Sequence, residues 1–303
     1  MLFRQLEYFV ALARERHFAR AAAACYVSQP ALSEAIRKLE HELKVPLVKR
    51  ARTFEGLTPE GERLVLWARR ILADRDALQQ EVVALQTGLT GELRLGVIPA
   101  AAATVARLTD PFCADNPLVR VRVDTGLESA DIVDRLRRFE LDAGLVYPDG
   151  RDTPDMTVTP LYSEDHVVLA AEGLLTGATG SVDWAEVVEL PLCLLRPGMR
   201  GRELIDDALA GHGLTADPRL ETDSVATLFG QVATGRWATI VPESWLRATR
   251  PPAGARVLRP RDPVTATVAL VTLATEPVPL IIRAFTETSR LVRLDGGPGG
   301  DLG

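Results

Sequence analysis

The segment that most constrains the fold lies at residues 18–43, FARAAAACYVSQPALSEAIRKLEHEL. Ser28 is a favourable N-cap, because its hydroxyl can accept a hydrogen bond from a free backbone N–H of a first helical turn. Pro30 suits that first turn, where its missing N–H costs little. The segment therefore predicts a short alanine-rich helix, a tight turn at Tyr26 and Val27, and a second helix that starts after Ser28.

Apolar side chains recur along the second helix at helical spacing. They are Leu32, Ile36, Leu39 and Leu43. Gln and Arg elsewhere on its surface can hydrogen-bond base edges, and Ser and Lys suit phosphate oxygens. The outline is that of a helix-turn-helix, whose second helix can enter the major groove of DNA. The alternative is an ordinary helical hairpin with a solvated polar face.

The flanking sequence extends this motif to a small domain. Upstream, a further amphipathic stripe predicts a first helix at Leu2, Leu6, Phe9, Val10 and Ala13. Downstream, a basic run followed by Gly56 and Leu57 indicates a β-hairpin wing. Arg50 or Arg52 of that run could enter a minor groove, where negative potential is concentrated. For the basic run alone, a solvated loop is an equal alternative.

Residues 1–61 closely resemble the LysR-type transcriptional regulators. The matching positions are Leu6, Phe9, Phe18, Ala21, Ala22, Val27 through Ser33, Ile36, Leu39, Glu40, Leu47, Arg50, Leu57, Thr58 and Gly61. The resemblance implies a winged helix-turn-helix that binds operator DNA. The DNA-binding residues we predict are Ser28, Gln29, Pro30, Ser33, Arg37, Lys38, Arg50, Arg52 and Thr58.

Four positions in this region depart from the usual family pattern. Cys25, Lys44 and Val48 stand where leucine, glycine and phenylalanine are common, which indicates variation in packing or in a turn. Glu34 stands where a polar or basic residue is frequent. A carboxylate that faced DNA would repel phosphates.

The charge of the chain is divided unevenly. The net charge is −6, yet residues 1–58 hold ten Lys or Arg against six Asp or Glu. The remaining 245 residues hold 25 against 35. Salt screens phosphate attraction beyond roughly 8–10 Å, so a basic N-terminal region can bind DNA beside an acidic remainder.

Composition limits the other classes of function. The 303 residues, 47% of them hydrophobic, suffice for two or three domains with sizeable cores. The three cysteines are odd in number and far apart in the sequence: Cys25, Cys113 and Cys193. This pattern argues against a disulfide framework and favours a reducing cytoplasm. We find no signal peptide, no run of 18 apolar residues, no zinc spacing and no catalytic motif such as G-x-S-x-G. We therefore expect no enzyme, no metal, no cofactor and no membrane contact.

A long helix is predicted from Pro59 to about Gln86, capped by Thr58 and ended by glycines. Apolar residues repeat every seven positions along it, at Leu64, Ile71, Leu78 and Leu85. A helix of roughly 44 Å cannot bury such a stripe within a small winged domain, so a partner helix is expected. The alternative is packing against its own C-terminal domain. The family resemblance points to a linker helix that pairs two chains, with tetramers common among members.

From Glu92 the pattern changes to alternating short strands and helices, which predicts a mainly parallel sheet covered on both faces. The first strands expected are Leu93–Val97, Val119–Val123 and Ala143–Val146. The second set is Val167–Ala170, Leu192–Leu195, Arg219–Thr222, Ala238–Val241 and Thr265–Thr272. Two α/β lobes favour a ligand in the cleft between them, beyond the carboxyl ends of the strands.

The resemblance implies that this C-terminal region is similar to a periplasmic substrate-binding protein and binds a small-molecule effector. The effector residues it suggests are Pro99, Ala100, Ala101, Ala102, Leu127, Glu128, Ser129, Arg196, Pro197, Gly198, Asp223, Ser224 and Val225. An anionic or carboxylate effector is our hypothesis, because Pro99 begins a helix and Arg196, Arg200 and Arg202 lie nearby. The alternative is that these arginines pair with acidic side chains.

The predicted architecture is multi-domain. A winged helix-turn-helix at 1–58 and a linker or dimerisation helix at 59–88 precede an effector domain at 89–303, with lobe I at about 91–161 and 267–295 and lobe II at about 162–266. The predicted function is that of a bacterial, cytoplasmic, LysR-type regulator whose partners are operator DNA, a second copy of itself, a small effector and RNA polymerase. The alternatives are a thiol redox sensor or effector-independent regulator of the same fold, and a solute-binding protein.

Overall fold

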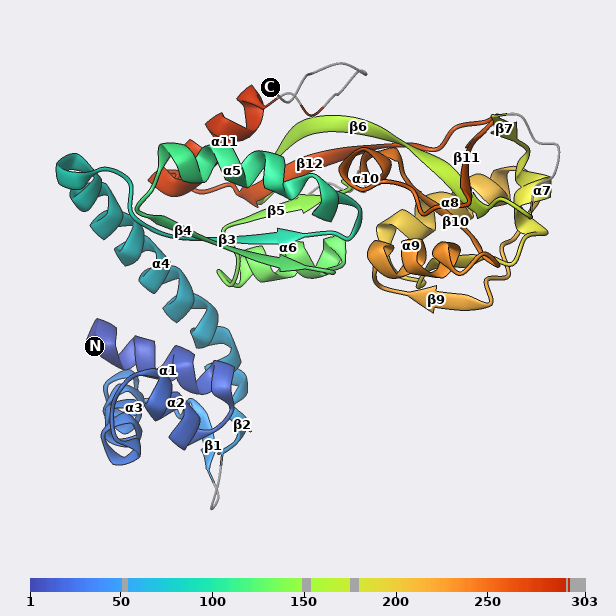
Figure 1. Cartoon of the computed structure of the whole chain (residues 1–303). Helices are drawn as coiled ribbons and strands as arrows, with labels where there is room; N and C mark the ends of the chain where they lie inside the picture. The colour runs from blue at the N-terminus through green and yellow to red at the C-terminus, as the bar shows by residue number, and fades with distance from the viewer. Residues whose placement is uncertain (51–53, 149–153, 175–179, 293, 295–303) are drawn as a thin grey trace. The chain divides into compact units, whose positions relative to one another are not determined.

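The computed structural model describes residues 1–50, 54–148, 154–174, 180–292 and 294. The chain divides into two compact units, Met1–Thr87 and Gly88–Gly303 (Figure 1). Each unit is built on its own buried hydrophobic side chains, with one cluster in the first unit and three in the second. Each unit therefore has its own hydrophobic core; the first unit is mainly helical and the second is α/β.

In the first unit three short helices surround one core: α1 (Phe3–Glu15), α2 (Phe18–Ala24) and α3 (Gln29–Leu43). Leu12 of α1 and Leu32 of α3 are fully buried in this core, and Ala21 of α2 lets the helices approach closely. An antiparallel hairpin follows, formed by β1 (Val48–Arg50) and β2 (Phe54–Leu57). This is the winged helix-turn-helix expected from the sequence.

Lys44, one of the departures from the family pattern, ends α3 in the left-handed conformation with φ of 56°. Its backbone N–H donates to the carbonyl oxygens of Glu40 and His41 and so closes the last helical turn. Glycine adopts this conformation at no steric cost, whereas a side chain costs roughly 1–2 kcal/mol. The glycine usual at this position is explained by its geometry, and the lysine keeps that geometry at a modest cost.

Helix α4 (Pro59–Thr87) continues from the wing as a rod of roughly 44 Å. The Thr58 hydroxyl caps it by accepting from Gly61 N at 2.9 Å, and it donates to Pro46 O at 2.7 Å. A Cβ at Gly61 would lie 2.1 Å from Leu47 O, so only glycine allows the helix to pack this closely on the wing. Val65 and Ala68 are buried against the same core.

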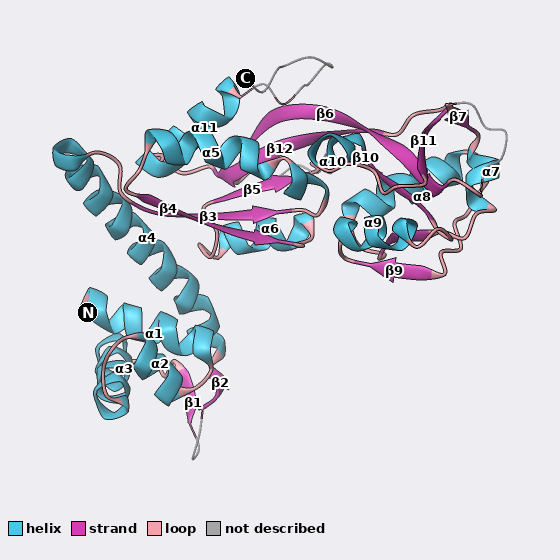
Figure 2. Ribbon diagram, in the orientation of Figure 1, coloured by secondary structure: helices cyan, strands magenta, loops and turns pink. Residues whose placement is uncertain are grey.

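The second unit begins with a parallel arrangement of β3 (Gly91–Val97), β4 (Val119–Thr125) and β5 (Ala143–Val146). The 3-10 helix η1 (Ala100–Ala103) and helices α5 (Val105–Asp115), α6 (Ser129–Arg137) and α11 (Leu280–Leu291) belong to this lobe. In Figure 2, α5 and α11 lie on one side of the sheet and α6 on the other. Phe112 and Phe285 join α5 to α11 edge to face, with ring centroids 5.2 Å apart.

The strand β6 (Met156–Ala171) is the main departure from expectation, because only Val167–Ala170 was predicted as a strand. Its first part pairs antiparallel with β12 (Thr265–Leu273) in lobe I. Its second part pairs antiparallel with β10 (Ala238–Pro242) and β11 (Ala255–Pro260) in lobe II. A mainly parallel sheet was therefore the wrong expectation for the crossing between lobes, where one long strand serves both.

Lobe II is completed by short elements around the end of β6. A second small parallel sheet consists of β8 (Cys193–Leu195) and β9 (Leu220–Thr222), and β7 (Ser181–Val182) extends β11. The helices are α7 (Trp184–Val188), α8 (Arg200–Gly211), α9 (Val225–Ala233) and α10 (Glu243–Ala248). Among the helices of the described residues, none has the length and apolar content needed to cross a membrane.

Candidate functional site

Helix α3 separates its buried and exposed faces as the sequence predicted. Leu32, Ile36 and Leu39 are fully buried, whereas Leu43 reaches the surface. The side chains predicted to meet DNA lie outside the core: Gln29, Pro30, Arg37 and Lys38 are exposed and Ser33 is half-buried. The core thus holds the helix by one face and leaves the polar face free for a partner.

The start of α3 is organised by Ser28. Its hydroxyl accepts a hydrogen bond from Ala31 N at 3.4 Å, and Pro30 lies in the first turn. Further along, an Arg37 nitrogen lies 3.8 Å from a Glu34 carboxylate oxygen, and both side chains are more than half exposed. A pair this exposed contributes little to stability, so Arg37 can leave Glu34 for a phosphate or a base.

Thr58, predicted to contact DNA, is committed to the fold. Its hydroxyl donates to Pro46 O and accepts from Gly61 N. Thr58 thus connects the segment before the wing to the first turn of the linker helix. The backbone of Arg50 ends β1, but its side chain and all of Arg52 lie outside the described residues. The wing contacts predicted for these two arginines therefore remain predictions.

Tyr26 is a surface residue that the sequence reasoning did not single out. It occupies the turn before α3 with φ of 56° and is almost fully exposed. Single exposed aromatic side chains occur on most proteins, so the exposure of Tyr26 does not by itself assign it a function. The predicted tight turn at Tyr26 was a usable signal, since the residue in a left-handed turn points away from the core.

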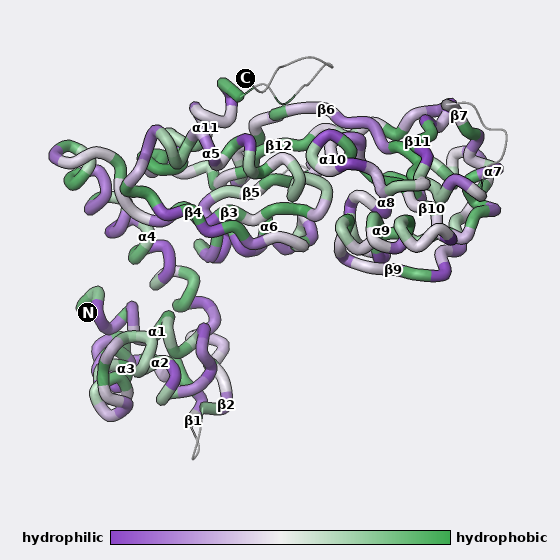
Figure 3. The backbone as a smooth tube through the Cα atoms, viewed as in Figure 1, coloured by the Kyte–Doolittle hydropathy of each residue, from purple (hydrophilic) through white to green (hydrophobic). Residues whose placement is uncertain are grey.

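The predicted seam of α4 divides into two halves. Leu64 and Ile71 are half-buried and pack against the core of their own domain. Leu78 and Leu85 are 65% and 87% exposed. At about 100° per residue, the exposed Trp67 and Val82 fall within roughly 60° of these two leucines around the helix. Figure 3 shows hydrophobic and hydrophilic residues interleaved along α4.

The N-terminus of α1 adds to the exposed apolar surface of this unit. Phe3 is half exposed, and the Arg75 guanidinium of α4 lies 5.4 Å from the centre of its ring. Arg75 also forms an ion pair with Glu7, so α1 is joined to α4 along this edge. Met1 and Leu2 are exposed beside Phe3. The unit thus presents an apolar surface that runs from α1 onto the linker helix.

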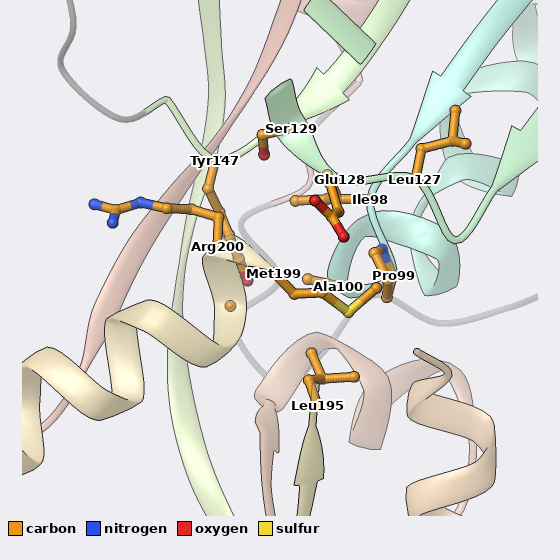
Figure 4. Close-up of a pocket in the computed structure, with 11 residues that line it drawn as sticks. Ile98, Pro99, Ala100, Leu127, Glu128, Ser129, Tyr147, Leu195, Met199 and Arg200 are labelled. Carbon is orange, nitrogen blue, oxygen red and sulfur yellow. The ribbon is translucent and has the colours of Figure 1, made fainter. Parts of the chain in front are cut away.

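In the second unit a small pocket, partly open to solvent, lies between the two lobes (Figure 4). The side chains around it come from the carboxyl ends of β3 and β5, the start of α6, the end of β8 and the start of α8. They are Ile98, Pro99, Ala100, Leu127, Glu128, Ser129, Tyr147, Leu195, Met199, Arg200 and Gly201.

Five of the predicted effector residues line this pocket: Pro99, Ala100, Leu127, Glu128 and Ser129. Ala101 is fully buried and Ala102 is half-buried, and neither borders it. The residues that were not predicted follow strand ends, as Ile98 follows β3 and Tyr147 follows β5. The rule that ligands bind beyond carboxyl strand ends was therefore the signal for them.

The predicted loop at Arg196, Pro197 and Gly198 does not line the pocket, although its neighbours Leu195 and Met199 do. A nitrogen of the Arg196 guanidinium lies 3.1 Å from Glu128 Oε1, which links lobe II to lobe I. A Cβ at Gly198, whose φ is 88°, would lie 3.8 Å from the other Glu128 oxygen. The loop thus contacts the lining through Glu128, and all three of its residues are exposed.

A second small compartment shares Ala100, Leu195 and Gly201 with the first. We call the first the outer compartment and the second the inner compartment. Val225 is the one predicted residue of the Asp223–Val225 turn that borders it. Asp223 is exposed, and Ser224 caps α9 by accepting from Thr227 N at 3.3 Å. The sequence therefore placed the turn correctly near the cleft but not its individual side chains.

Polar side chains are buried beneath the cleft, where β6 crosses between lobes. The Tyr147 hydroxyl donates to Glu164 Oε1 at 2.5 Å, and Glu164 is only 2% exposed. Burial raises the pKa of Glu164, since a carboxylate is poorly solvated there. His166 lies two residues further along the same strand. Burial lowers its pKa to about 4, so this imidazole is neutral at neutral pH.

The arginines near the cleft are paired with carboxylates, as the alternative to the anion hypothesis required. Arg200 lies 3.1 Å from Glu203 and Arg202 lies 2.9 Å from Asp206, in addition to the pair at Arg196. Arg202 is further held 2.8 Å from Glu221, and Arg200 lies 4.0 Å from Asp207. These arginines therefore do not support an anionic effector, because each is already paired with a carboxylate.

The other observation behind the anionic hypothesis was the helix that starts at Pro99, and backbone N–H groups at that start are already hydrogen-bonded. The helix there is a 3-10 turn of four residues, Ala100–Ala103. Ala101 N donates to Ile98 O at 3.1 Å, and Ala102 N donates to Pro99 O at 3.3 Å. These N–H groups are satisfied within the turn and are not available to an anion, because an N–H already hydrogen-bonded gains little from another acceptor.

The three cysteines lie in different environments. Cys25 is half-buried in the first unit, Cys113 is exposed on α5, and Cys193 is buried in lobe II. Burial raises the pKa of Cys193 to about 11, so its thiol is protonated at neutral pH and weakly nucleophilic. Cys113 is therefore the accessible thiol of the effector unit.

Two family models match the chain. Residues 3–62 match the bacterial regulatory helix-turn-helix protein of the lysR family, and residues 86–291 match the LysR substrate binding domain. A probable hydrogen peroxide-inducible genes activator of Streptomyces viridosporus is 35% identical over 243 residues, 79% of this chain and 77% of that protein.

Solved structures show the same architecture. A full-length OxyR from Pseudomonas aeruginosa superimposes with a TM-score of 0.77 at 27% identity, covering 98% of this chain and 99% of that one. Full-length CbnR complexed with its target DNA gives a TM-score of 0.68 at 24% identity, covering 96% and 99% of the respective chains. The latter likeness concerns the fold.

The two family models together extend from the recognition helix through both lobes of the cleft. They cover well over half of the chain, including helix α3 and the residues around the cleft, and leave out residues 63–85 of α4. Members of this family are DNA-binding, non-enzymatic transcription regulators that oligomerise and carry an effector-binding domain. The chain belongs to the LysR family of bacterial transcriptional regulators.

Proposed function

We propose that a small-molecule effector binds in the cleft between lobes I and II and thereby controls operator binding by the first unit. One observation carries this proposal: the pocket is bordered by both lobes, and contacts across it join them. Arg196 of lobe II meets Glu128 of lobe I, and Trp245 Nε1 donates to Ala100 O at 2.9 Å. A ligand that favours one arrangement of these contacts shifts the population of the whole domain toward it.

The operator contacts we propose come from the exposed face of α3. They are Ser28, Gln29, Pro30, Ser33, Arg37 and Lys38, with Arg50 and Arg52 of the wing added on sequence grounds. The exposure of this face and the excess of basic residues in this unit support the assignment. Thr58 is proposed to support the wing through its hydrogen bonds.

A homodimer is proposed to form through the exposed half of α4. Leu78, Val82 and Leu85 are apolar side chains with no covering element in the described part of their unit, and Leu64 and Ile71 extend the stripe. A two-fold dimer suits half-sites about one helical turn apart, roughly 34 Å, or a multiple of that distance. Assembly to a tetramer, contact with RNA polymerase and action in the cytoplasm, where the operator lies, are further parts of the proposal.

The effector proposal can be tested by filling the cleft. Gly201 borders both compartments, and a Cβ there would lie 3.4 Å from Leu195 and 3.8 Å from Tyr147, so Gly201→Phe should occupy the space. We expect this variant to bind operator DNA in a mobility-shift assay but to ignore the low-molecular-weight cell extract that changes binding by the native protein.

Gly211→Phe is the matched control, because Gly211 ends the same helix and has no atom within 4 Å of its ideal Cβ. It should respond to the extract as the native protein does. An undiminished response from Gly201→Phe, with its fold intact by circular dichroism, would show that control does not pass through the cleft.

A thiol redox sensor of the same fold is the second candidate, favoured by the peroxide-inducible activator among the relatives. In this chain Cys113 is the exposed thiol, whereas burial raises the pKa of the half-buried Cys25 and of the buried Cys193. We therefore assign the sensing role in this alternative to Cys113. Peroxide should then change operator binding by the native protein but not by Cys113→Ser. Equal binding with and without peroxide would exclude this alternative.

A further inference from the structure

The two compartments of the cleft lie next to each other and have mainly apolar walls. They share Ala100, Leu195 and Gly201. Ile98, Leu127 and Met199 border the outer compartment, and Ile205 and Ile240 border the inner one. Such a wall stabilises a ligand by roughly 25 cal/mol for each Å² of apolar surface that leaves water.

The charged groups around this space do not favour an anion. Of the charged residues, Glu128, Arg200 and Arg202 border it, and both arginines are paired, Arg200 with Glu203 and Asp207 and Arg202 with Asp206 and Glu221. Arg196, which follows Leu195 of the lining, is paired with Glu128. Buried Glu164 behind Tyr147 adds no positive charge. An anion entering the cleft would lose its hydration and meet no unpaired guanidinium among these three.

The inner compartment contains one polar group suited to a ligand, the imidazole of His166. This side chain is 3% exposed and borders the compartment. Its Nδ1 lies 3.1 Å from Val264 O, and a carbonyl can only accept, so Nδ1 carries the proton. A neutral ring protonated at Nδ1 has its lone pair on Nε2, which has no hydrogen-bond partner among the described residues.

Two further polar atoms at the outer compartment are buried without a partner within the described residues. They are Ser129 Oγ and Arg200 Nε, and the side chains of both border the pocket. Native proteins rarely leave such atoms unsatisfied, so each marks a place where a ligand or a water completes the hydrogen bonding. A hydroxyl or an amide can serve a donor and an acceptor together.

We propose, on the basis of the effector function proposed above, that the cleft selects an uncharged, mainly apolar molecule with a hydrogen-bond donor, and that His166 Nε2 accepts from that donor. Alcohols, phenols and primary or secondary amides are the matching chemical classes. Ser129 and Arg200 would donate to an acceptor atom at the outer end of such a molecule. Carboxylates are the class that this arrangement rejects.

Three probes with one aromatic ring separate these classes: benzyl alcohol, its methyl ether and benzoate. Their dissociation constants can be measured by NMR titration of the full-length protein, with long-range ¹H–¹⁵N spectra reporting the nitrogens of its four histidines. Benzyl alcohol should bind about tenfold more tightly than the ether, since one such hydrogen bond contributes on the order of 1.4 kcal/mol. It should also shift the Nε2 resonance of His166, and benzoate should bind most weakly.

His166→Phe should remove the preference for the alcohol over the ether while keeping the apolar wall. His166→Leu, which also lacks a hydrogen-bond acceptor, should lose the preference as well and serves if the phenylalanine variant does not fold. His212→Gln is the matched control, because His212 lies on the surface of lobe II away from the cleft lining. It should bind all three probes as the native protein does.

Tighter binding of benzoate than of benzyl alcohol would overturn this inference, as would a preference for the alcohol that survives in His166→Phe. An unmoved Nε2 resonance on saturation with the alcohol, or no binding of any probe, would overturn it too. None of these results affects the effector function, which depends on the Gly201→Phe response. That function fails only if the filled cleft still responds, so the two failures are distinguishable.

Discussion

The exposed face of α3 and the cleft of the effector unit use similar polar residues in opposite ways. On α3 the side chains of Gln29, Arg37 and Lys38 are exposed, and the ion pair between Arg37 and Glu34 is loose at 3.8 Å. Around the cleft Arg200 and Arg202 are held by acidic neighbours at 3.1 and 2.9 Å. An arginine available to a ligand and an arginine used by the fold cannot be told apart by residue type.

The difference follows from what each surface must do. A protein that binds DNA gains part of its affinity from counterion release, so exposed basic groups that can meet phosphates strengthen binding. A cleft between two lobes needs its buried charges neutralised, because an unpaired charge in a low-dielectric site destabilises the fold. The comparison can be tested by changing groups that the structure shows to be free and groups that it shows to be committed.

The largest effect is expected for a free apolar group, in Leu78→Asp. Leu78 is 65% exposed, so the change should leave the monomer folded while placing a charge in the proposed dimer seam. The dissociation constant of the dimer should rise by about two orders of magnitude, an effect of roughly 2–4 kcal/mol. Sedimentation velocity at several concentrations measures it.

Val83→Asp is its control, since Val83 is also exposed on α4 but lies about 140° from Leu78 around the helix. Ile71→Asp is a less clear test, because Ile71 packs partly on its own domain and the charge would also weaken that core. A dimer of native stability in Leu78→Asp would refute the seam.

The next effect concerns a committed group, His166, whose pKa burial lowers from 6.5 to about 4. A base with a lowered pKa in the folded state takes up its proton more readily when unfolded, so the protein loses stability as the pH falls from 6.5 toward 4. The loss from this residue should approach about 3 kcal/mol. His166→Gln should remove most of that dependence in urea unfolding followed from pH 7 to pH 4.

His212 provides a contrast of opposite sign. It is exposed, and its hydrogen bonds to Ala208 O and Asp262 raise its pKa. Its contribution is therefore present below its unfolded pKa and is lost as the pH rises through the folded value. His212→Gln should therefore lose stability between pH 7 and pH 4 as the native protein does. If His166→Gln also loses stability to the same extent over this range, the imidazole of His166 is not held neutral in the folded protein.

A smaller effect is expected for Arg37→Ala, which removes an exposed guanidinium from the proposed recognition face. Operator affinity should fall by about 1–3 kcal/mol, with a shallower dependence on salt if the contact is to phosphate. A mobility-shift assay on operator DNA found by genomic footprinting measures both. Arg290→Ala, which removes an exposed arginine from α11 in the other unit, should bind operator normally. Equal affinities of the two variants would contradict the role of α3.

The smallest effect is a gain, in Glu34→Gln. The carboxylate competes with DNA for Arg37 and repels phosphates, and both penalties are modest because the pair is exposed. Operator affinity should rise by about twofold to fivefold, most clearly at low salt. A weaker complex would mean that Glu34 contacts a base directly, as a carboxylate can by accepting from cytosine.

The sequence predicted the first unit almost completely because its rules are local. An N-cap at Ser28, a proline in the next turn and apolar residues at helical spacing act within one or two turns of the chain. The same rules placed α4 within one residue of its observed end at Thr87. They did not show that Leu64 and Ile71 pack partly against the core of their own domain, because the spacing of apolar residues does not specify what they pack against.

The second unit was predicted in outline and missed in its crossing strand. Pro160, Glu164 and Asp165 interrupt the apolar pattern of β6, so strand propensity recovered only its last residues. The structure keeps these residues extended because β12 pairs with them along the whole of lobe I. Pairing between residues a hundred positions apart leaves no local signal, and Glu164 is buried with Tyr147 as a result.

The sequence by itself determined the family, the two-unit order, the recognition helix and the presence of two α/β lobes. These depend on spacing and capping, which the chain carries wherever it folds. Only the tertiary structure decided which polar groups are free. It paired the arginines of the cleft with acids from other elements, committed Thr58 to the wing and gave His166 a carbonyl partner across the lobe crossing. Such commitments arise between residues distant in sequence, and they determine which chemistry remains for a ligand.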